Sequence, residues 1–385
     1  MTLAATNHLA PDDDLKWLRR KTRPVSSFHE VIRSVDIFSG CGGLTLGVSE
    51  ACRRMALGHS VEMASEMDSG ILGIFKDNFG PALSLEGDIR DYFDGDVSNP
   101  SLTVAESLLI ADNPGVIEPE LLVGGPPCQG HSDLNNHSRR NDPRNSLYFS
   151  MIRAARVIRP KAVIIENVQT VTSAKERVVQ RSIELLEEMG YRVSHEVLKA
   201  EEFGVPQLRR RHFLVASLGS EPDFSVLDEY RSSRVRSLRT ALYGLESSYD
   251  ESDLFNSSAR SSERNRERMS WLLENDEYDL PNAERPPCHQ NGHNYPAVYG
   301  RMRWEVPTHT ITAGFGSNGQ GRFMHPDFPR TLTPHEAARV QTFPDWFDFS
   351  GHNDLRKTLS KSIGNAVPPL LAMYVAHVAL LSIRG

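Results

Sequence analysis

A short apolar run that ends abruptly in glycine, proline and cysteine constrains this chain more than any other feature. Residues 121–123 (Leu-Leu-Val) predict a buried strand, and residues 124–128 (Gly-Gly-Pro-Pro-Cys) predict a loop that presents a thiol. Because proline fixes φ, Pro126 and Pro127 give the sulfur of Cys128 a defined direction. A lone cysteine is more often a small buried apolar residue. The rigid loop at a strand end instead favours a nucleophile.

A second strand-like run, residues 160–168, is apolar until the carboxylate of Glu166. The helix-like residues 147–158 have the length of a right-handed crossover between two parallel strands. Active sites of open parallel sheets lie outside the carboxyl ends of the strands, so Cys128 and Glu166 are expected in one crevice. Glu166 alone could cap a helix, but beside a nucleophile it is predicted to be a general acid.

A glycine-rich turn lies upstream, where residues 40–43 contain three glycines after the strand-like residues 35–38. Such a turn lets backbone amides approach a ligand closely, although it is not the dinucleotide fingerprint. Glu66 ends the second predicted strand, about where a ribose diol is usually held, and Asp88 follows the third. This combination favours an adenosyl ligand over a pyrophosphate.

Six short blocks occur in a fixed order along the chain, and together they resemble the cytosine-C5 DNA methyltransferase family. The blocks are residues 36–44, 125–129, 166–168, 207–211, 330–339 and 362–369. The resemblance covers roughly residues 33 to 385. It implies an α/β fold, with a Rossmann-like S-adenosylmethionine-dependent methyltransferase sheet and a second, smaller target-recognition domain. It also implies an enzyme that methylates carbon 5 of cytosine in DNA.

The predicted catalytic residues suit this chemistry. Carbon 5 of cytosine is a poor nucleophile, and a thiolate from Cys128 that adds to carbon 6 would activate it. Glu166 would protonate N3 as the thiolate adds. The resemblance places Pro127, Arg209 and Arg211 beside these two residues, with Arg211 as the contact to cytosine O2. The alternative for the arginines is a solvated basic patch.

The resemblance also implies a set of residues that bind S-adenosylmethionine and its product S-adenosylhomocysteine. Glu66 is expected to hold the ribose, Asp88 to accept from the adenine amino group, and Ile89 to lie beside the ring. Met67 stands where the family often has a large aromatic residue, so stacking on adenine should be weaker. His131 replaces a common phenylalanine. The expected contacts to the methionine portion are Phe38, Gly40, Gly42, Gly43, Asn365 and Val367.

A base inside a duplex must be flipped out before such an enzyme can reach it. The polar residues 129–147 include Arg139, Arg140 and Arg144, and they predict a loop that closes over DNA. The family has its active-site loop in this place. An ordinary solvated surface loop is the alternative.

Residues 310–322 predict a loop that reads the DNA sequence. This stretch contains four glycines, together with Asn318, Gln320 and Arg322, which are side-chain types that contact base edges. In the family a recognition loop lies just before the block that begins at Arg330. A hairpin turn between two strands is the alternative.

The length of 385 residues exceeds what one core usually supports. The predicted domains are an N-terminal extension (1–32), a catalytic and cofactor-binding domain (33–219), a target-recognition domain (220–345) and a C-terminal segment (346–385). The final helix, residues 369–383, is expected to return to the catalytic sheet. Strand–helix alternation is expected to stop after about Ser217, with one helical piece near residues 264–273.

Composition is compatible with this assignment. The chain is 39% hydrophobic and 24% charged, as in globular proteins, and it lacks an apolar run of membrane-spanning length or a signal-peptide core. Four cysteines without paired spacing argue against disulfides and a metal site, and fit a reducing cytoplasm. The net charge of −7 is unexpected for a DNA-binding protein, so positive charge should be concentrated on one face.

Two other functions remain open at this stage. One is a tRNA cytosine-C5 methyltransferase of the related family, although the roughly 110 residues before Arg330 resemble a DNA-recognition insert. The other is a catalytically silent DNA-binding relative, whose expected loss of the nucleophile or the acid is not seen. The expected partner is double-stranded DNA in the bacterial cytoplasm, without a membrane, and a monomer is expected. The DNA site and a pairing with a restriction endonuclease stay undetermined.

Overall fold

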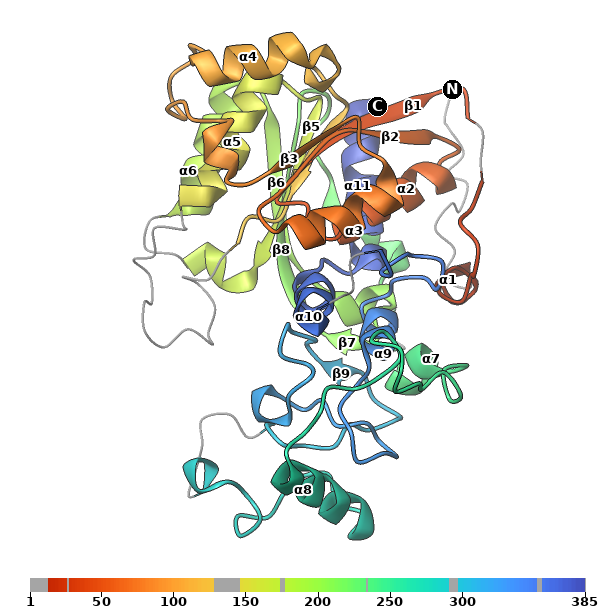
Figure 1. Cartoon of the computed structure of the whole chain (residues 1–385). Helices are drawn as coiled ribbons and strands as arrows, with labels where there is room; N and C mark the ends of the chain where they lie inside the picture. The colour runs from red at the N-terminus through yellow and green to blue at the C-terminus, as the bar shows by residue number, and fades with distance from the viewer. Residues whose placement is uncertain are drawn as a thin grey trace.

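Seven strands form one sheet in the upper half of the molecule (Figure 1). The computed structural model describes residues 13–25, 28–127, 146–173, 177–232, 235–290, 297–351 and 355–384. The strand order is β3-β2-β1-β4-β5-β8-β6, and β8 alone runs antiparallel to its neighbours. The strands are β1 (Val31–Ile37), β2 (Gly58–Glu66), β3 (Leu83–Glu86), β4 (Leu121–Gly124), β5 (Ala162–Val168), β6 (Arg192–Lys199) and β8 (Arg210–Ser217). The predicted α/β fold is confirmed, including the parallel pairing of β4 with β5.

Alternate residues of the central strands face two different cores, which explains why these strands are apolar throughout. In β4, Leu121 and Val123 belong to the core that contains α2 and α11, whereas Leu122 belongs to the core that contains α5 and α6. A sheet buried on both faces requires apolar residues at every position. The helices are α2 (Gly43–Arg54), α3 (Ser69–Phe79), α4 (Val104–Asp112), α5 (Ser146–Ile158), α6 (Val178–Glu188) and α11 (Pro369–Arg384).

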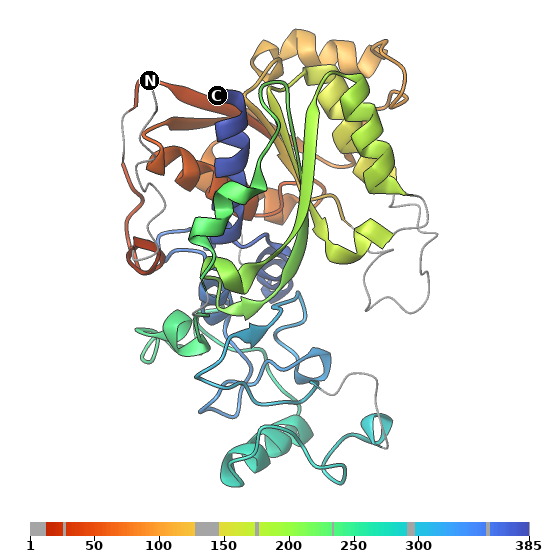
Figure 2. The ribbon, with the colours of Figure 1, turned by 180° about the vertical axis from the view of Figure 1, so that it is seen from behind.

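Helix α11 returns from the end of the chain to the sheet, as expected. It packs against α2, β5 and β8, and in Figure 2 it lies on the near side of the sheet. Nearly all of its side chains are buried. No single helix in the described part of the chain is long and apolar enough to cross a membrane. Only α10 (Arg356–Asn365) and α11 together meet that test, as a pair bent by 43°.

Below the sheet the chain has little regular structure, as expected beyond Ser217 (Figure 1). The elements here are α7 (Leu238–Leu242), α8 (Glu263–Glu274), α9 (Pro334–Val340) and a short sheet of β7 (Gln207–Leu208) and β9 (Thr308–His309). Helix α8 agrees with the predicted helical piece, whereas α7, α9 and α10 were not foreseen. The boundaries predicted for a target-recognition domain remain a prediction.

The N-terminal arm connects the lower region with the sheet. Its helix α1 (Asp13–Leu18) ends in the buried side chains of Trp17 and Leu18. The Arg19 guanidinium lies 4.4 Å from the ring centroid of Tyr243, just beyond α7. The Arg23 guanidinium donates to the carbonyl oxygen of Asn78 in α3. The arm therefore holds elements from both parts of the molecule.

A buried polar network joins the sheet edge to the lower region. The amide nitrogen of Gln207 donates to the side-chain oxygen of Gln341 at 2.6 Å, and its amide oxygen accepts from the backbone N–H of Ile311 at 3.1 Å. Gln341 in turn donates to the carbonyl oxygen of Ile363 in α10 at 2.6 Å. Both glutamine side chains are fully buried. Their hydrogen bonds therefore fix β7, the end of α9 and the end of α10 to one another.

Candidate active site

The loop that leads to Cys128 lies against Glu166. The side-chain amide of Asn167 donates to the carbonyl oxygen of Pro126 at 3.2 Å, and a Cβ added to Gly125 would lie 3.2 Å from a Glu166 carboxylate oxygen. Pro127 is exposed and is the last residue described before Cys128. Cys128 itself, like Arg139, Arg140 and Arg144, lies outside the described residues.

Glu166 and Arg211 form an ion pair at the carboxyl edge of the sheet. Arg211 Nε lies 2.8 Å from Glu166 Oε1, and the two side chains are only 15% and 11% exposed. The antiparallel register places Arg211 opposite Val168, two residues beyond Glu166 in β5. The pair thus presents a carboxylate, which accepts hydrogen bonds, beside a guanidinium, which donates them.

Arg209 is placed differently from Arg211. Its guanidinium is buried and donates to the carbonyl oxygens of Ile311 and Ala366, each at 3.0 Å. Burial lowers the pKa of Arg209 well below its ordinary value. These contacts support a role in positioning the neighbouring segments. The catalytic role predicted for Arg209 stays a prediction.

The glycine-rich turn after β1 forms a small open cradle. Phe38, Gly40 and Gly42 all have positive φ (60°, 54° and 96°), which explains why glycine is favoured at two of these positions. An added Cβ would meet nothing within 4 Å at Gly40, but would lie 2.2 Å from the Phe79 ring at Gly42. The turn is therefore open on the side of Gly40 and packed on the side of Gly42.

The carboxylate of Glu66 closes one side of this cradle. It accepts from the backbone N–H of Gly40 at 3.1 Å and from that of Asp68 at 3.1 Å. Burial raises the pKa of Glu66. A buried carboxylate beside an open glycine turn fits a ligand that carries hydroxyl groups, such as a ribose.

The C-terminal block packs directly on the glycine turn. A Cβ added to Gly43 would lie 2.3 Å from the carbonyl oxygen of Val367, so only glycine allows this approach. The Cys41 thiol donates to the carbonyl oxygen of Ser362 at 3.2 Å. Asn365 is exposed at the end of α10, and Val367 is buried. The structure thus brings together the two ends of the predicted cofactor site.

The residues predicted to contact adenine differ in their exposure and in their present contacts. The Asp88 carboxylate is bound by the Arg90 guanidinium, whose hydrogen bonds lower the pKa of Asp88. Ile89 is buried in the core beside α5, and Met67 is 62% exposed. An adenine amino group would therefore share the Asp88 carboxylate with Arg90.

The three predicted base-reading residues lie in three different environments. Gln320 is exposed, whereas the Asn318 side chain is buried and its amide oxygen has no hydrogen-bond partner among the described residues. The Arg322 guanidinium forms an ion pair with Asp279 and donates to the carbonyl oxygens of Tyr278 and Arg301. As the structure stands, Gln320 is the one of these three that can meet DNA without rearrangement.

Asp36 was not singled out from the sequence, although it begins the first family block. Its carboxyl group is buried at the end of β1, where one oxygen accepts from the Thr45 hydroxyl and the other has no partner in the part of the chain that the structure describes. Burial raises the pKa of Asp36 to about 8. The hydrogen bond from Thr45 links the end of β1 to α2. The sequence signal that could have identified Asp36 is an acidic residue inside an otherwise apolar strand.

The chain belongs to the C-5 cytosine-specific DNA methylases, because the family profile matches residues 32–380. It is a DNA cytosine-5-methyltransferase. It is 42% identical to Type II methyltransferase M1.BsuMI of Bacillus subtilis (strain 168), over 94% of this chain and 84% of that protein. Identity to Type II methylase M.HgiDII of Herpetosiphon aurantiacus is 30%, over 89% and 93%. The fold is similar to that of the S. pombe Dnmt2 methyltransferase, with a TM-score of 0.60 at 16% identity over 92% of this chain and all of that one.

Asp36→Asn should change how stability depends on pH. The folded protein keeps the Asp36 proton up to about pH 8, whereas the unfolded chain releases it near pH 4. The stabilising contribution of the protonated group is therefore complete below about pH 4 and is lost as the pH rises towards 8. Asparagine cannot titrate. The free energy of unfolding of the wild type relative to the variant should fall across this window, by up to roughly 1.4 kcal/mol per pH unit.

Urea denaturation of both proteins at several pH values measures this difference. Because all other titrating groups are shared, their contributions cancel in the comparison. A difference in unfolding free energy that stays constant from pH 5 to pH 8 would contradict the raised pKa.

Proposed function

We propose that the protein transfers a methyl group from S-adenosylmethionine to carbon 5 of a flipped-out cytosine in a specific duplex DNA sequence, through a covalent bond between Cys128 and carbon 6. The observation that carries this proposal is the ion pair of Glu166 and Arg211 beside the loop that leads to Cys128. The relatives named Type II methyltransferases support a role in restriction and modification, paired with an endonuclease in the bacterial cytoplasm. A monomer would suffice for this reaction.

In the proposed mechanism, Cys128, Glu166 and Arg211 each act on a defined atom of the cytosine. The Cys128 thiolate adds to carbon 6 while Glu166 gives a proton to N3, which makes carbon 5 nucleophilic. Arg211 donates a hydrogen bond to cytosine O2 and holds Glu166 in place. After methylation, the proton on carbon 5 passes to a solvent base, the thiolate leaves carbon 6, and N3 returns its proton to Glu166, which restores the ring. Pro127 directs the sulfur, and Arg209 supports this edge of the sheet from behind.

S-Adenosylmethionine supplies an electrophilic methyl group when it is bound. The residues proposed to hold it are Phe38, Gly40, Gly42, Gly43, Glu66, Met67, Asp88, Ile89, Asn365 and Val367. The open turn at Gly40 and the buried Glu66 carboxylate support the methionine and ribose assignments. The bond between Asp88 and Arg90 makes the adenine contact the weakest part of this assignment.

The DNA-binding part of the proposal rests on two segments. Residues 220–345 would form the target-recognition domain, and the loop with Arg139, Arg140 and Arg144 would close over the flipped base. Exposure of Gln320 supports a direct contact with a base edge. Methylation assays with duplex DNA and with tRNA would separate this function from tRNA methylation.

Cys128→Ser should abolish methylation while leaving cofactor and DNA binding largely unchanged, because a hydroxyl is a far weaker nucleophile than a thiolate. Wild-type protein should form a covalent adduct with DNA that carries 5-fluorocytosine, since fluorine blocks the final elimination. Denaturing electrophoresis detects the adduct. Cys52→Ala, in the buried core of α2, is the matched control and should still form it. Failure of active wild-type protein to form the adduct would rule out the nucleophile.

Glu166→Gln should lower turnover about 10²–10⁴-fold, the usual contribution of general acid catalysis. Glutamine keeps the shape and the hydrogen bond with Arg211 but cannot donate the proton. Single-turnover methylation measures the loss of turnover. Calorimetric titration with S-adenosylmethionine measures the cofactor affinity, which should hardly change. Glu184→Gln, exposed on α6, should retain full turnover. An equal loss of cofactor affinity in Glu166→Gln would place Glu166 in the cofactor site instead.

Alanine at Gln320 should relax the base preference at one or two positions of the methylated site. A base-edge contact contributes about 1–3 kcal/mol of discrimination, whereas a phosphate contact weakens binding to all sequences alike. Sequencing of methylated cytosines in cells that express each variant measures the preference. The same outcome is predicted for alanine at Asn318 or Arg322, and it requires that DNA binding release these two side chains from their present surroundings. If all three variants keep the site unchanged, specificity is read elsewhere, within residues 220–300.

A further inference from the structure

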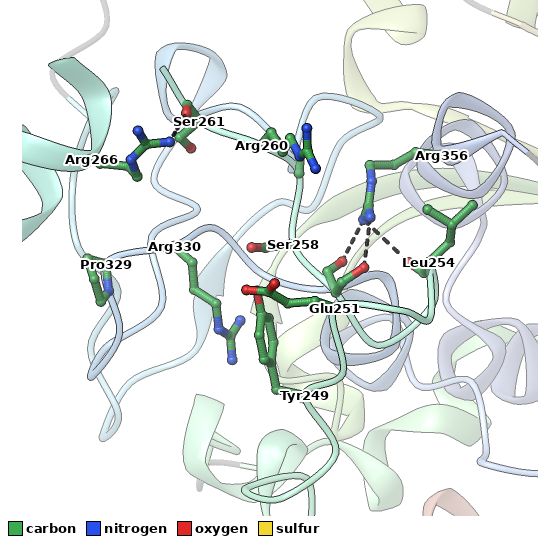
Figure 3. A pocket seen from close by; sticks show the side chains of 12 residues that line it. Tyr249, Glu251, Leu254, Ser258, Arg260, Ser261, Arg266, Pro329, Arg330 and Arg356 are labelled. Carbon is green, nitrogen blue, oxygen red and sulfur yellow. Dashed lines mark hydrogen bonds between the residues drawn. The ribbon is translucent and has the colours of Figure 1, made fainter. Parts of the chain in front are cut away.

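A cavity of about 790 Å³ lies in the lower region, away from the carboxyl edge of the sheet (Figure 3). Three segments line it: residues 249–266, the turn at Pro329 and Arg330, and Arg356 at the start of α10. Serine hydroxyls and arginine side chains dominate its wall. Neither the catalytic residues nor the predicted base-reading residues line it.

The cavity is strongly positive, because four arginines and a single acid, Glu251, line it. The arginines are Arg260, Arg266, Arg330 and Arg356. Arg330 and Arg356 are bound by neighbouring groups, Arg330 by Glu336 and Arg356 by the Ser257 carbonyl and hydroxyl oxygens. Their guanidinium groups therefore add positive charge to the cavity, but the N–H groups used in these contacts are not available to a ligand.

The other two arginines retain free donors. Arg260 is exposed and makes no hydrogen bond or ion pair within the described part of the chain. Arg266 is exposed and donates from one nitrogen to the carbonyl oxygen of Ser261. It lies in the first turn of the 12-residue helix α8, whose N-terminal backbone N–H groups also favour an anion. Together these groups suit a phosphate, which guanidinium groups bind in a bidentate manner.

Helix α10 connects this cavity with the cofactor site. Arg356 is its first residue and Asn365 its last, so the two ends are roughly 15 Å apart at 1.5 Å per residue. Lys357, exposed on the same helix, continues the positive charge towards that site.

We propose that Arg260 and Arg266 bind phosphates of the DNA backbone outside the site of the target cytosine. This inference rests on the proposed function, and it adds a contact that positions the duplex without reading its sequence. The −7 net charge of the chain makes such a local concentration of positive charge necessary for binding.

The test is the double variant Arg260→Gln/Arg266→Gln, measured by DNA binding over a series of salt concentrations. Each lost phosphate contact should reduce the slope of log affinity against log salt by about 0.9, so the slope should fall by about 1–2. Affinity should fall alike for cognate and unrelated duplexes. The methylated sequence and the affinity for S-adenosylmethionine should not change.

Arg159→Gln is the matched control, because Arg159 is exposed at the opposite edge of the sheet, before β5, where it pairs with Glu118. It should keep the wild-type slope. An unchanged slope in the double variant would overturn the proposed contact while leaving the proposed function intact. A wild-type protein that methylates no duplex DNA would overturn the proposed function itself. Altered sequence preference in the double variant would show base reading and also contradict this inference.

Discussion

The position of the sheet relative to the lower region depends on the contacts of the buried Arg209 guanidinium. Its two terminal nitrogens donate to the carbonyl oxygens of Ile311 and Ala366, whereas its buried Nε has no hydrogen-bond partner among the described residues. Gln207 and Gln341 add a second set of buried hydrogen bonds between the same segments. Loss of one partner in such a network leaves a buried polar group unsatisfied, which costs more than the bond itself contributes. The two parts are therefore held in one arrangement.

This arrangement also determines the shape of the predicted cofactor site. The network fixes the end of α10, and the next residues reach the glycine turn, where Gly43 touches the Val367 carbonyl. Lys361 adds an ion pair with Asp68 at the start of α3. A cradle built from residues 38–43 and 361–367 thus requires the chain to return from the lower region. The predicted cofactor site and the lower region are therefore connected through one short helix, α10.

Much of the fold follows from the sequence because strands buried on both faces must be continuously apolar. This rule located β4 and β5, and helical periodicity located α5, α8 and α11. Hydrophobic periodicity could not predict the contact between Glu166 and Arg211. Only the resemblance to the family placed these two residues in one site. The partners of Arg209 are backbone carbonyls, and those of Arg322 are two backbone carbonyls and the Asp279 carboxylate; the positions of all these groups depend on the completed fold. Local pattern therefore cannot distinguish these bound arginines from free ones.

The same distinction explains how an acidic protein can bind DNA. Many arginines of the lower region are neutralised by nearby acids, such as Arg239 by Glu305, Arg301 by Asp276 and Arg322 by Asp279. Counting arginines in clusters therefore overestimates the positive surface that is free to meet phosphates. Arg260 and Arg266 are not neutralised in this way, and they line a cavity rather than a flat face. Low-dielectric walls around unpaired charges focus the local field, so a few such residues can attract a polyanion despite an unfavourable net charge.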